Sequence, residues 1–443
     1  MKRWIIDNGL RRGLNNMKIV SVRIEGFRNI ENTEITFGDI TSLISVNSYG
    51  KSNLMKAIEF AIDFIRADKV DKNTMMSWNH GIPLNKYIDS KNFVADFVFT
   101  TIHNGKVYFV NYGFEFVWIK NNGSGKEIVK EWLALKEDEK AQKYNKLICR
   151  DEKNLYKTSV TGRCNNILKV EKDELMVNKL MLIDSLYYTD VIVELNKINV
   201  YIERHLDASG WYCKNPLIHT NFDEFDLNEI ENIPRAIFYI KKKFRAKYDI
   251  LVNAFFQLFP NISMIDVREI DLGETYSSKF SNEVPYMVSN KVYAMYVQDD
   301  NMNQPLDFES LSDGAKRIFL MLTYIVLADI SDITLIAFEE PENSVHPNLL
   351  QGYLSVLSQL SRDCKIMIAS HSPYLMQYVN TEDIYIGKPN NQGIADFSKI
   401  DDRKIKQLLK DASDCSESVG SYIFDLLSGG KDDIDILLEY LEK

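Results

Sequence analysis

One short stretch of the sequence, SVNSYGKSN, holds residue types that bind phosphate. Gly50, Lys51 and Ser52 match the second half of the phosphate-loop pattern G-x-x-x-x-G-K-[ST], in which backbone amides and a lysine surround phosphate oxygens. Ser45 stands where the pattern has its first glycine, and the bulky Tyr49 precedes Gly50. A serine suits that position only where the backbone needs neither positive φ nor very close packing. Because Gly-Lys-Ser alone occurs often by chance, its interpretation depends on the rest of the chain.

Three later blocks place polar residues at the ends of apolar segments. In LSDGAKRIFLMLTYIVLA, Ser312 and Gly314 open an amphipathic helix. ITLIAFEEPENSVHP is an apolar strand that ends in Glu339 and Glu340, and CKIMIASHSP is a second buried strand that ends at His371. Each block alone is weak, since paired glutamates more often begin a solvated helix and a lone histidine is more often a satisfied buried residue.

The order of the four blocks resembles that of the ATP-binding-cassette (ABC) ATPases. Within them it is similar to the SMC/RecF/OLD-like group of AAA-type bacterial ATPases. The opening IVSVRIEGFRNIENTEITF resembles the first hairpin of that group, and FEEPENSVHP resembles its acidic strand with the following loop. The resemblance covers about residues 17–67 and 305–385 well and the middle weakly. Four blocks in order at workable spacing form a specific signal.

The resemblance implies ATP and Mg²⁺ as ligands. Catalysis of phosphoryl transfer consists mostly of positioning and charge stabilisation. Lys51 would neutralise phosphate oxygens, Glu340 would orient or deprotonate the attacking water, and His371 would contact the γ-phosphate. Ser52 would ligate Mg²⁺ and Glu339 would hold it through water. The nucleotide-binding residues of the loop would be Asn47, Ser48, Tyr49, Gly50, Lys51, Ser52 and Asn53.

The resemblance also implies self-association. In this family the helix start at Ser312 and Gly314 faces the γ-phosphate bound to the other subunit, and a helix N-terminus is a natural anion site. One chain would then hold half of each site, so we expect a homodimer or a higher even-numbered oligomer. His346, in the loop after the acidic strand, would lie at the interface between subunits.

The elements that position these residues predict an α/β fold. We expect an ABC-ATPase head, which has a mixed sheet with flanking helices, an antiparallel β-subdomain and a helical insert. Strands over 17–25, 31–36 and 40–46 lead to the loop, and a helix follows from Asn53 to Ile65. Asn104-Gly105 marks the turn of a hairpin over 93–119.

The remaining pattern divides the chain into segments. Apolar residues at three- and four-residue spacing predict long helices from Asp173 to His205 and from Pro234 to Leu258. Another hairpin is expected over 384–397. The predicted segments are a loose basic leader (1–16), an N-terminal lobe (17–127), an insert with β structure and then long helices (128–258), a C-terminal lobe (259–385), and a terminal hairpin with short helices (386–443).

The composition limits the kinds of partner and the cellular setting that are expected for this chain. A net charge of -10 argues against a general nucleic-acid coat. For the basic run within residues 241–247, a solvated helix face is favoured over a contact with DNA. No apolar run is long enough to suggest a membrane partner. Five scattered cysteines without C-x-x-C spacing fit a reducing, cytoplasmic setting. The basic run consists of Lys241, Lys242, Lys243, Arg245 and Lys247.

Three functions fit this sequence. The chain resembles the stand-alone ATPase subunits of bacterial anti-phage systems of the Septu, PARIS or retron-associated types, which implies a slowly hydrolysing, ATP-gated switch for a separate nuclease or toxin. A RecF-like DNA-repair clamp is the second function, and a nucleotide-binding scaffold without hydrolysis is the third. Neither the acidic strands of a Toprim nuclease nor HNH spacing is found, so no nuclease activity is expected in this chain.

Overall fold

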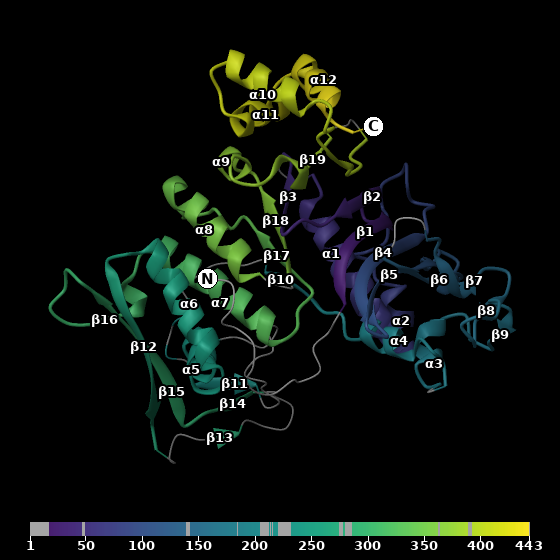
Figure 1. The fold of residues 1–443 in the computed structure, drawn as a ribbon, viewed down its shortest axis with the longest axis horizontal. Helices are drawn as coiled ribbons and strands as arrows, with labels where there is room; N and C mark the ends of the chain where they lie inside the picture. Colours follow the sequence, from purple (N-terminus) through teal and green to yellow (C-terminus); the bar gives the residue numbers. More distant parts are fainter. Residues whose placement is uncertain are drawn as a thin grey trace.

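The computed structural model of the protein has a largely parallel sheet at its centre and an antiparallel sheet beside it (Figure 1). The structure describes residues 17–46, 49–138, 142–183, 185–203, 212, 214, 216–219, 232–273, 278–279, 286–361, 364–388 and 392–442. Among these residues, no helix combines the length and the apolar character needed to cross a bilayer.

The central sheet places the expected site at one edge. Its strands lie in the order β10, β17, β18, β3, β19 and β20, and only β20 runs antiparallel to its neighbour. Glu339 pairs with Ala369, and Ser370 pairs with Ile44, so the carboxyl ends of three neighbouring strands meet. The bounds are β10 (Val200–Glu203), β17 (Leu335–Glu339), β18 (Lys365–Ser370), β3 (Ile40–Ile44), β19 (Ile384–Gly387) and β20 (Phe397–Lys399).

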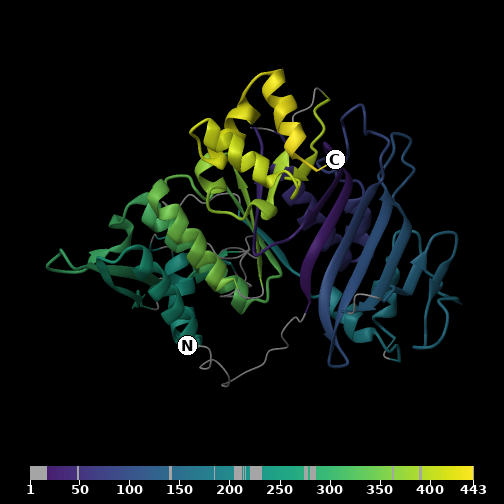
Figure 2. The same cartoon turned by 45° about the horizontal axis from the view of Figure 1, so that its top comes forward.

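An antiparallel sheet of eight strands forms the second layer (Figure 2). The predicted hairpin over 93–119 is confirmed, because His103 pairs with Lys106 across Asn104 and Gly105, which both have positive φ. In spatial order the strands are β2 (Ile30–Thr36), β1 (Lys18–Phe27), β4 (Phe93–His103), β5 (Lys106–Val117), β6 (Glu127–Glu137), β7 (Asn145–Arg150), β8 (Asn154–Tyr156) and β9 (Asn166–Ile167).

Helix α1 (Lys51–Arg66) packs between the two sheets. Its buried side chains share one apolar core with the antiparallel sheet and with one face of the parallel strands, such as Leu335 and Met367. Alternate residues of these strands, such as Ile336 and Ile366, face a second core. That core is built largely on α5 (Ile233–Lys243), α6 (Arg245–Leu258), α7 (Asp313–Ile330) and α8 (Pro347–Leu360).

Smaller elements complete the described chain. One three-stranded sheet consists of β12 (Ile262–Asp271), β15 (Lys291–Asp299) and β16 (Leu306–Asp307), and another of β11 (Leu217–His219), β14 (Tyr286–Val288) and β13 (Ser278–Lys279). Short helices are α2 (Lys69–Met75), α9 (Pro373–Met376) and two 3-10 turns (Phe308–Ser310 and Thr381–Asp383). The terminal helices are α10 (Ile405–Asp414), α11 (Val419–Ser428) and α12 (Lys431–Tyr440).

The long helix predicted from Asp173 to His205 is wrong. The chain forms α3 (Met176–Leu180), α4 (Thr189–Leu195) and then β10, whose residues pair with β17, while residues 204 and 205 lie outside the described part. Ile198 and Ile202 kept the helical spacing, but the β-branched Val200 and Ile202 form a strand because the edge of a parallel sheet is available to them.

Two other expectations differ from the structure. The helix predicted from Pro234 to Leu258 is two helices, α5 and α6, separated at Phe244, whose φ of -132° and ψ of 57° are not helical. The predicted boundary after residue 127 does not separate layers, since β5 pairs with β6 along its length. Strands β6 to β9 lie at the start of the segment expected to hold β structure and then long helices, and they extend the antiparallel sheet.

Candidate active site

Residues that are far apart in the sequence meet at the carboxyl edge of the parallel sheet. Lys51, at the start of α1, places its Nζ atom 3.0 Å from Nε2 and 3.2 Å from Nδ1 of His371. His371 Nε2 lies 3.6 Å from a carboxylate oxygen of Glu340. The phosphate-loop lysine, the residue after the acidic strand and the strand-end histidine therefore form one cluster. Parallel strands with adjacent carboxyl ends bring them together.

Lys51 is held inside the loop. Its Nζ donates to the carbonyl and the hydroxyl of Ser45, each at 3.1 Å, and to the carbonyl of Val46 at 3.4 Å. The side chain is only 6% exposed, and burial lowers its pKa to about 8, although the nearby glutamates partly oppose the shift. Burial, followed by the Lys51 charge, also lowers the pKa of His371. The cluster thus pairs a partly desolvated cation with a neutral imidazole at neutral pH.

The start of α1 has no side-chain cap among the described residues. Gly50 occupies the N-cap with φ 134°. The first turn carries no acidic residue, so its amide groups face the loop without a competing charge. A Cβ atom at Gly50 would lie 2.7 Å from that of Ala395, so glycine is required by space as well as by φ. Asn47 and Ser48 lie outside the described residues.

The two departures from the phosphate-loop pattern have a structural explanation. The Tyr49 hydroxyl donates to the carbonyl of Lys388 and accepts from the amide of Asp396 at 3.1 Å, and its ring meets Phe397 edge-on at 5.6 Å. Tyr49 therefore ties the loop to the β19–β20 hairpin, which the sequence had also predicted. Ser45 does not have positive φ, so a side chain is tolerated there.

The acidic strand end has an unsatisfied oxygen. Oε1 of Glu339 is buried and has no hydrogen-bond partner within the described part of the chain. Glu340 has φ 48°, its amide donates to the carbonyl of Ala369 at 2.8 Å, and its Oε2 accepts from the Asn343 amide at 2.6 Å. A buried carboxylate oxygen without a donor fits a hard cation such as Mg²⁺. The Ser52 hydroxyl, one residue after Lys51, is the matching neutral ligand type.

Sequence reasoning missed two groups at this site. Glu342, two residues after Glu340, accepts hydrogen bonds from the Ser370 hydroxyl and from the His371 amide. The only sequence signal was the further glutamate in FEEPE. The other missed group is Arg28 and Asn29, on the other side of the loop: Arg28 donates to the predicted residue Asn53 at 2.6 Å, and Asn53 donates to Asn29 at 2.8 Å.

Arg28, Asn29 and Asn53 line an open pocket next to the phosphate loop. The pocket has a volume of about 310 Å³. Arg28 also donates through Nε to the carbonyl of His80, and Asn29 donates to the carbonyl of Tyr49 at 3.0 Å. The GFRN segment of the first hairpin was the signal that could have identified these residues. Besides Arg28 and Asn29, the lining consists of Asn53, Asn79, His80, Ile82, Leu84 and Asn85.

The helix start proposed to act on a second subunit packs against the loop after β17, and Arg317 of the same helix donates to the Glu340 carbonyl at 2.6 Å. Ser312 caps α7 by accepting from the Ala315 amide at 3.4 Å, and it makes no hydrogen bond to Lys51 or His371 within the described residues. A Cβ atom at Gly314 would lie 2.4 Å from the carbonyl oxygen of Ser344, so the loop after β17 packs directly against α7. His346 caps α8 through Nδ1, which accepts from the Asn348 amide at 3.3 Å.

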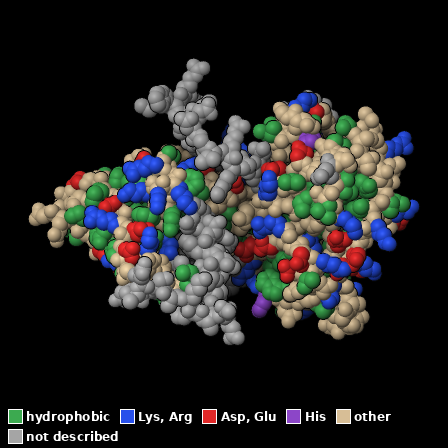
Figure 3. Space-filling model, turned by 90° about the horizontal axis from the view of Figure 1, so that it is seen from below, with side chains coloured by type: hydrophobic (Ala, Val, Ile, Leu, Met, Phe, Trp, Pro, Cys, Tyr) green, Lys and Arg blue, Asp and Glu red, His purple; other side chains and the backbone are tan. Residues whose placement is uncertain are grey.

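The basic run spans the end of α5 and the start of α6, and at least three of its five residues form ion pairs. Lys241 bonds to Asp266 at 2.8 Å, Arg245 lies 3.0 Å from Asp249, and Lys247 pairs with Asp329. Figure 3 shows Lys and Arg side chains interspersed with acidic and hydrophobic ones on the face of the molecule seen from below the view of Figure 1. These pairs favour the solvated-face interpretation over the DNA contact.

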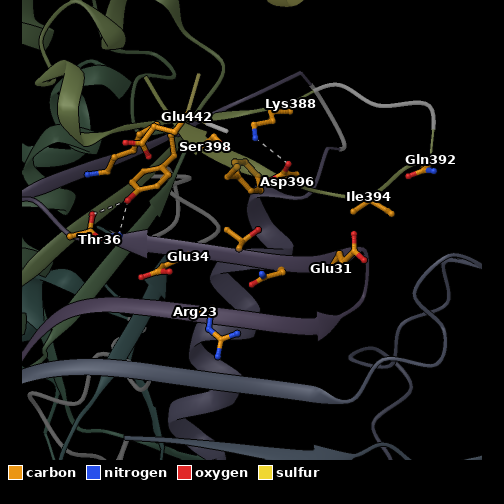
Figure 4. Close-up of a pocket in the computed structure, with 15 residues that line it drawn as sticks. Arg23, Glu31, Glu34, Thr36, Lys388, Gln392, Ile394, Asp396, Ser398 and Glu442 are labelled. Carbon is orange, nitrogen blue, oxygen red and sulfur yellow. Dashed lines mark hydrogen bonds and ion pairs between the residues drawn. The ribbon is translucent and has the colours of Figure 1, made fainter. Parts of the chain in front are cut away.

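A cavity of about 880 Å³ lies between β2 and the β19–β20 hairpin (Figure 4). At one end the Thr36 amide donates to the Tyr385 hydroxyl at 2.7 Å. Lys388 and Asp396, which hold Tyr49 through their backbone, also line this cavity and lie 3.4 Å apart as an ion pair. Lys51, Glu340 and His371 do not line it. The cavity therefore borders the support of the phosphate loop and is separate from the cluster.

One protein family and several solved structures match this chain. Residues 17–376 match the family described as AAA ATPase domain. Among solved structures, an SMC head bound to the C-terminal winged-helix domain of ScpA is 13% identical, with a TM-score of 0.47 over 88% of this chain and 99% of that one. An SMC head from Thermotoga maritima is 11% identical, with a TM-score of 0.40 over 87% of this chain and 99% of that one. An SMC head with an extended coiled coil, bound to the C-terminal domain of ScpA from Pyrococcus furiosus, is 12% identical, with a TM-score of 0.48 over 90% and 100%.

Proposed function

The chain belongs to the AAA ATPase domain family, and from this premise we propose that it binds ATP with Mg²⁺ and hydrolyses ATP. The observation that carries this proposal is the contact of Lys51 with His371 beside Glu340, at the start of α1. Hydrolysis of a phosphoanhydride requires a cation for the phosphates and a general base for water, and this cluster offers Lys51 and Glu340 for these tasks beside a neutral imidazole.

We assign roles to these residues as follows. The amides at the start of α1 and the Lys51 ammonium bind the phosphate oxygens. Ser52 and Glu339, whose Oε1 has no hydrogen-bond partner among the described residues, would hold Mg²⁺, which would supply positive charge to the phosphates. Glu340 orients the attacking water, and Asn343 fixes its carboxylate through the 2.6 Å hydrogen bond. His371 donates a hydrogen bond to a γ-phosphate oxygen from the ring nitrogen that carries the proton in its tautomer.

We propose further that two chains close over two ATP molecules. Support comes from the family resemblance, in which the N-terminus of this helix faces the γ-phosphate bound to the other subunit; here that N-terminus is the start of α7, with Ser312 as its N-cap. A complete site then needs a second copy, and ATP becomes a switch between open and closed states. Through its resemblance to stand-alone ATPase subunits of anti-phage systems, we propose that the closed state controls a separate nuclease or toxin.

Phosphate release and molar mass test this function together. We expect slow, Mg²⁺-dependent phosphate release by the purified chain, and a doubling of the mass measured by light scattering when ATP is present. EDTA is expected to abolish release. An absence of both ATP binding and phosphate release at millimolar ATP and Mg²⁺ would refute the ATPase proposal. Release without a change in mass would refute the dimer alone.

ATP binding is expected to take up protons above pH 8. Burial holds the pKa of Lys51 at about 8 without nucleotide, so the side chain is mostly neutral at pH 9, and adjacent phosphates raise that pKa on binding. The sign follows from linkage, since the bound state holds more protons and affinity must fall as pH rises above 8. Calorimetry at pH 9 in two buffers of different ionisation enthalpy should show an uptake of about one proton per ATP.

A second buried lysine provides the control. Lys72, in α2, also has a pKa of about 8 because of burial, but it bonds to the carbonyl of Ala67 and to Asn178 at 3.0 Å. The Lys72→Met variant should keep the proton uptake. Equal binding enthalpies in the two buffers for the wild-type protein would contradict the prediction.

A further inference from the structure

Glu342 is a buried carboxylate between two loops of the site. One oxygen, Oε1, accepts from the Ser370 hydroxyl and from the His371 amide at 3.3 Å. The other oxygen, Oε2, is buried and has no hydrogen-bond partner among the described residues. Burial raises the pKa of this carboxyl group. A carboxylate kept here at the cost of desolvation requires an explanation other than general stability.

The Glu342 side chain connects the two turns that carry the reacting groups. It belongs to the loop after β17, where Glu340 has positive φ and donates its amide to Ala369 of β18. Its partners belong to the turn after β18, where the Ser372 amide also donates to the Ser370 hydroxyl at 2.9 Å. Hydroxyl, amide and carboxylate therefore form a short network around the backbone of His371.

This network contacts the backbone from which the His371 ring projects. The ring is 28% exposed, and its nitrogens contact Lys51 at 3.0 and 3.2 Å and Glu340 at 3.6 Å. None of these contacts fixes the backbone from which the ring projects, whereas the bond from the His371 amide to Glu342 does. Ser344 of the same loop packs against Gly314 of α7, so this one loop contacts both α7 and the backbone of His371.

We propose that Glu342 is a positioning residue for hydrolysis: its carboxylate fixes the turn that carries His371 and so keeps the imidazole between Lys51 and Glu340. This inference rests on the proposed ATPase function. Glu342 need not touch nucleotide, water or metal, because its bonds are to Ser370 and to the His371 backbone. Its loss should lower the rate of the chemical step and leave ATP affinity nearly unchanged.

The test compares Glu342→Ala with Glu342→Gln. Glutamine retains an oxygen that can accept from both Ser370 and His371, and alanine retains none. We expect Glu342→Ala to lower kcat about tenfold or more with KM for ATP within threefold of wild type, and Glu342→Gln to recover most of the rate. Ser370→Ala, which removes one of the two donors, should give an intermediate loss.

Glu417 supplies a matched control. Its Oε2 is also buried without a hydrogen-bond partner in the described residues, but it precedes α11 in the C-terminal helices. Glu417→Ala should hydrolyse ATP at the wild-type rate. A wild-type rate in Glu342→Ala, or equal losses in the alanine and glutamine variants, would overturn the positioning role.

A second measurement separates this inference from the ATPase proposal. The chain has 6 histidines, so ¹⁵N-histidine spectra are simple enough to assign the His371 ring with a His371→Ala variant. Glu342→Ala should shift the His371 ring signals and its titration, and Glu342→Gln should leave both near wild type, even if no ATP is hydrolysed. An unchanged His371 titration in Glu342→Ala would overturn the inference whatever the ATPase result.

Discussion

Lys51→Ala is expected to weaken ATP binding by about 100-fold, which corresponds to about 2.7 kcal/mol. The Lys51 ammonium is the cation held at the start of α1, and without it the phosphate oxygens keep only the helix amides and the bound metal. Titration of a fluorescent ATP analogue measures the change directly.

The same substitution should not destabilise the protein without nucleotide. Burial disfavours the charged form of Lys51, so its removal relieves a desolvation cost and also loses the bonds to Ser45 and Val46. A melting temperature near that of wild type would show that lost binding is a site effect. Lys72→Met, which changes a buried lysine of α2, is expected to bind ATP normally. ATP affinity within threefold of wild type in Lys51→Ala would exclude Lys51 as a phosphate ligand.

Glu340→Gln is expected to reduce hydrolysis by about 100- to 1000-fold while ATP binding persists. Glutamine keeps the size of the side chain and an oxygen that can accept from Asn343, but it cannot take a proton from water. The variant should therefore accumulate as an ATP-bound dimer. Size-exclusion chromatography with light scattering, run with and without ATP, measures this accumulation.

Glu309→Gln serves as the control for Glu340→Gln. Glu309 is an exposed acidic residue of the 3-10 turn before α7, so its neutralisation changes net charge by the same amount outside the cluster. It should behave as wild type. A Glu340→Gln protein that stays monomeric in ATP, as the nucleotide-free protein is expected to be, would contradict the closed-dimer proposal. Unchanged phosphate release would exclude Glu340 as the base.

Local sequence signals predicted the parts of the fold whose partners are near in the chain. The Asn104-Gly105 turn specifies its hairpin because both residues tolerate positive φ. The strand–loop–helix around Lys51 follows from an apolar strand, a glycine at φ 134° and helical apolar spacing. Apolar spacing failed from Asp173 to His205, because the same residues satisfy a short helix or an edge strand, and only the neighbouring β17 decides between them.

The sequence by itself determined the residue types of the candidate site: a lysine after glycine, carboxylates and a histidine at the ends of apolar strands. Only the tertiary structure decided what surrounds them. Tyr49 is turned to the β19–β20 hairpin, and Glu342 is attached to the backbone of His371, by hydrogen bonds between segments far apart in the chain. Such bonds leave no periodic trace in the sequence, since they depend on which loops the sheet brings together and on how deeply packing buries each polar group.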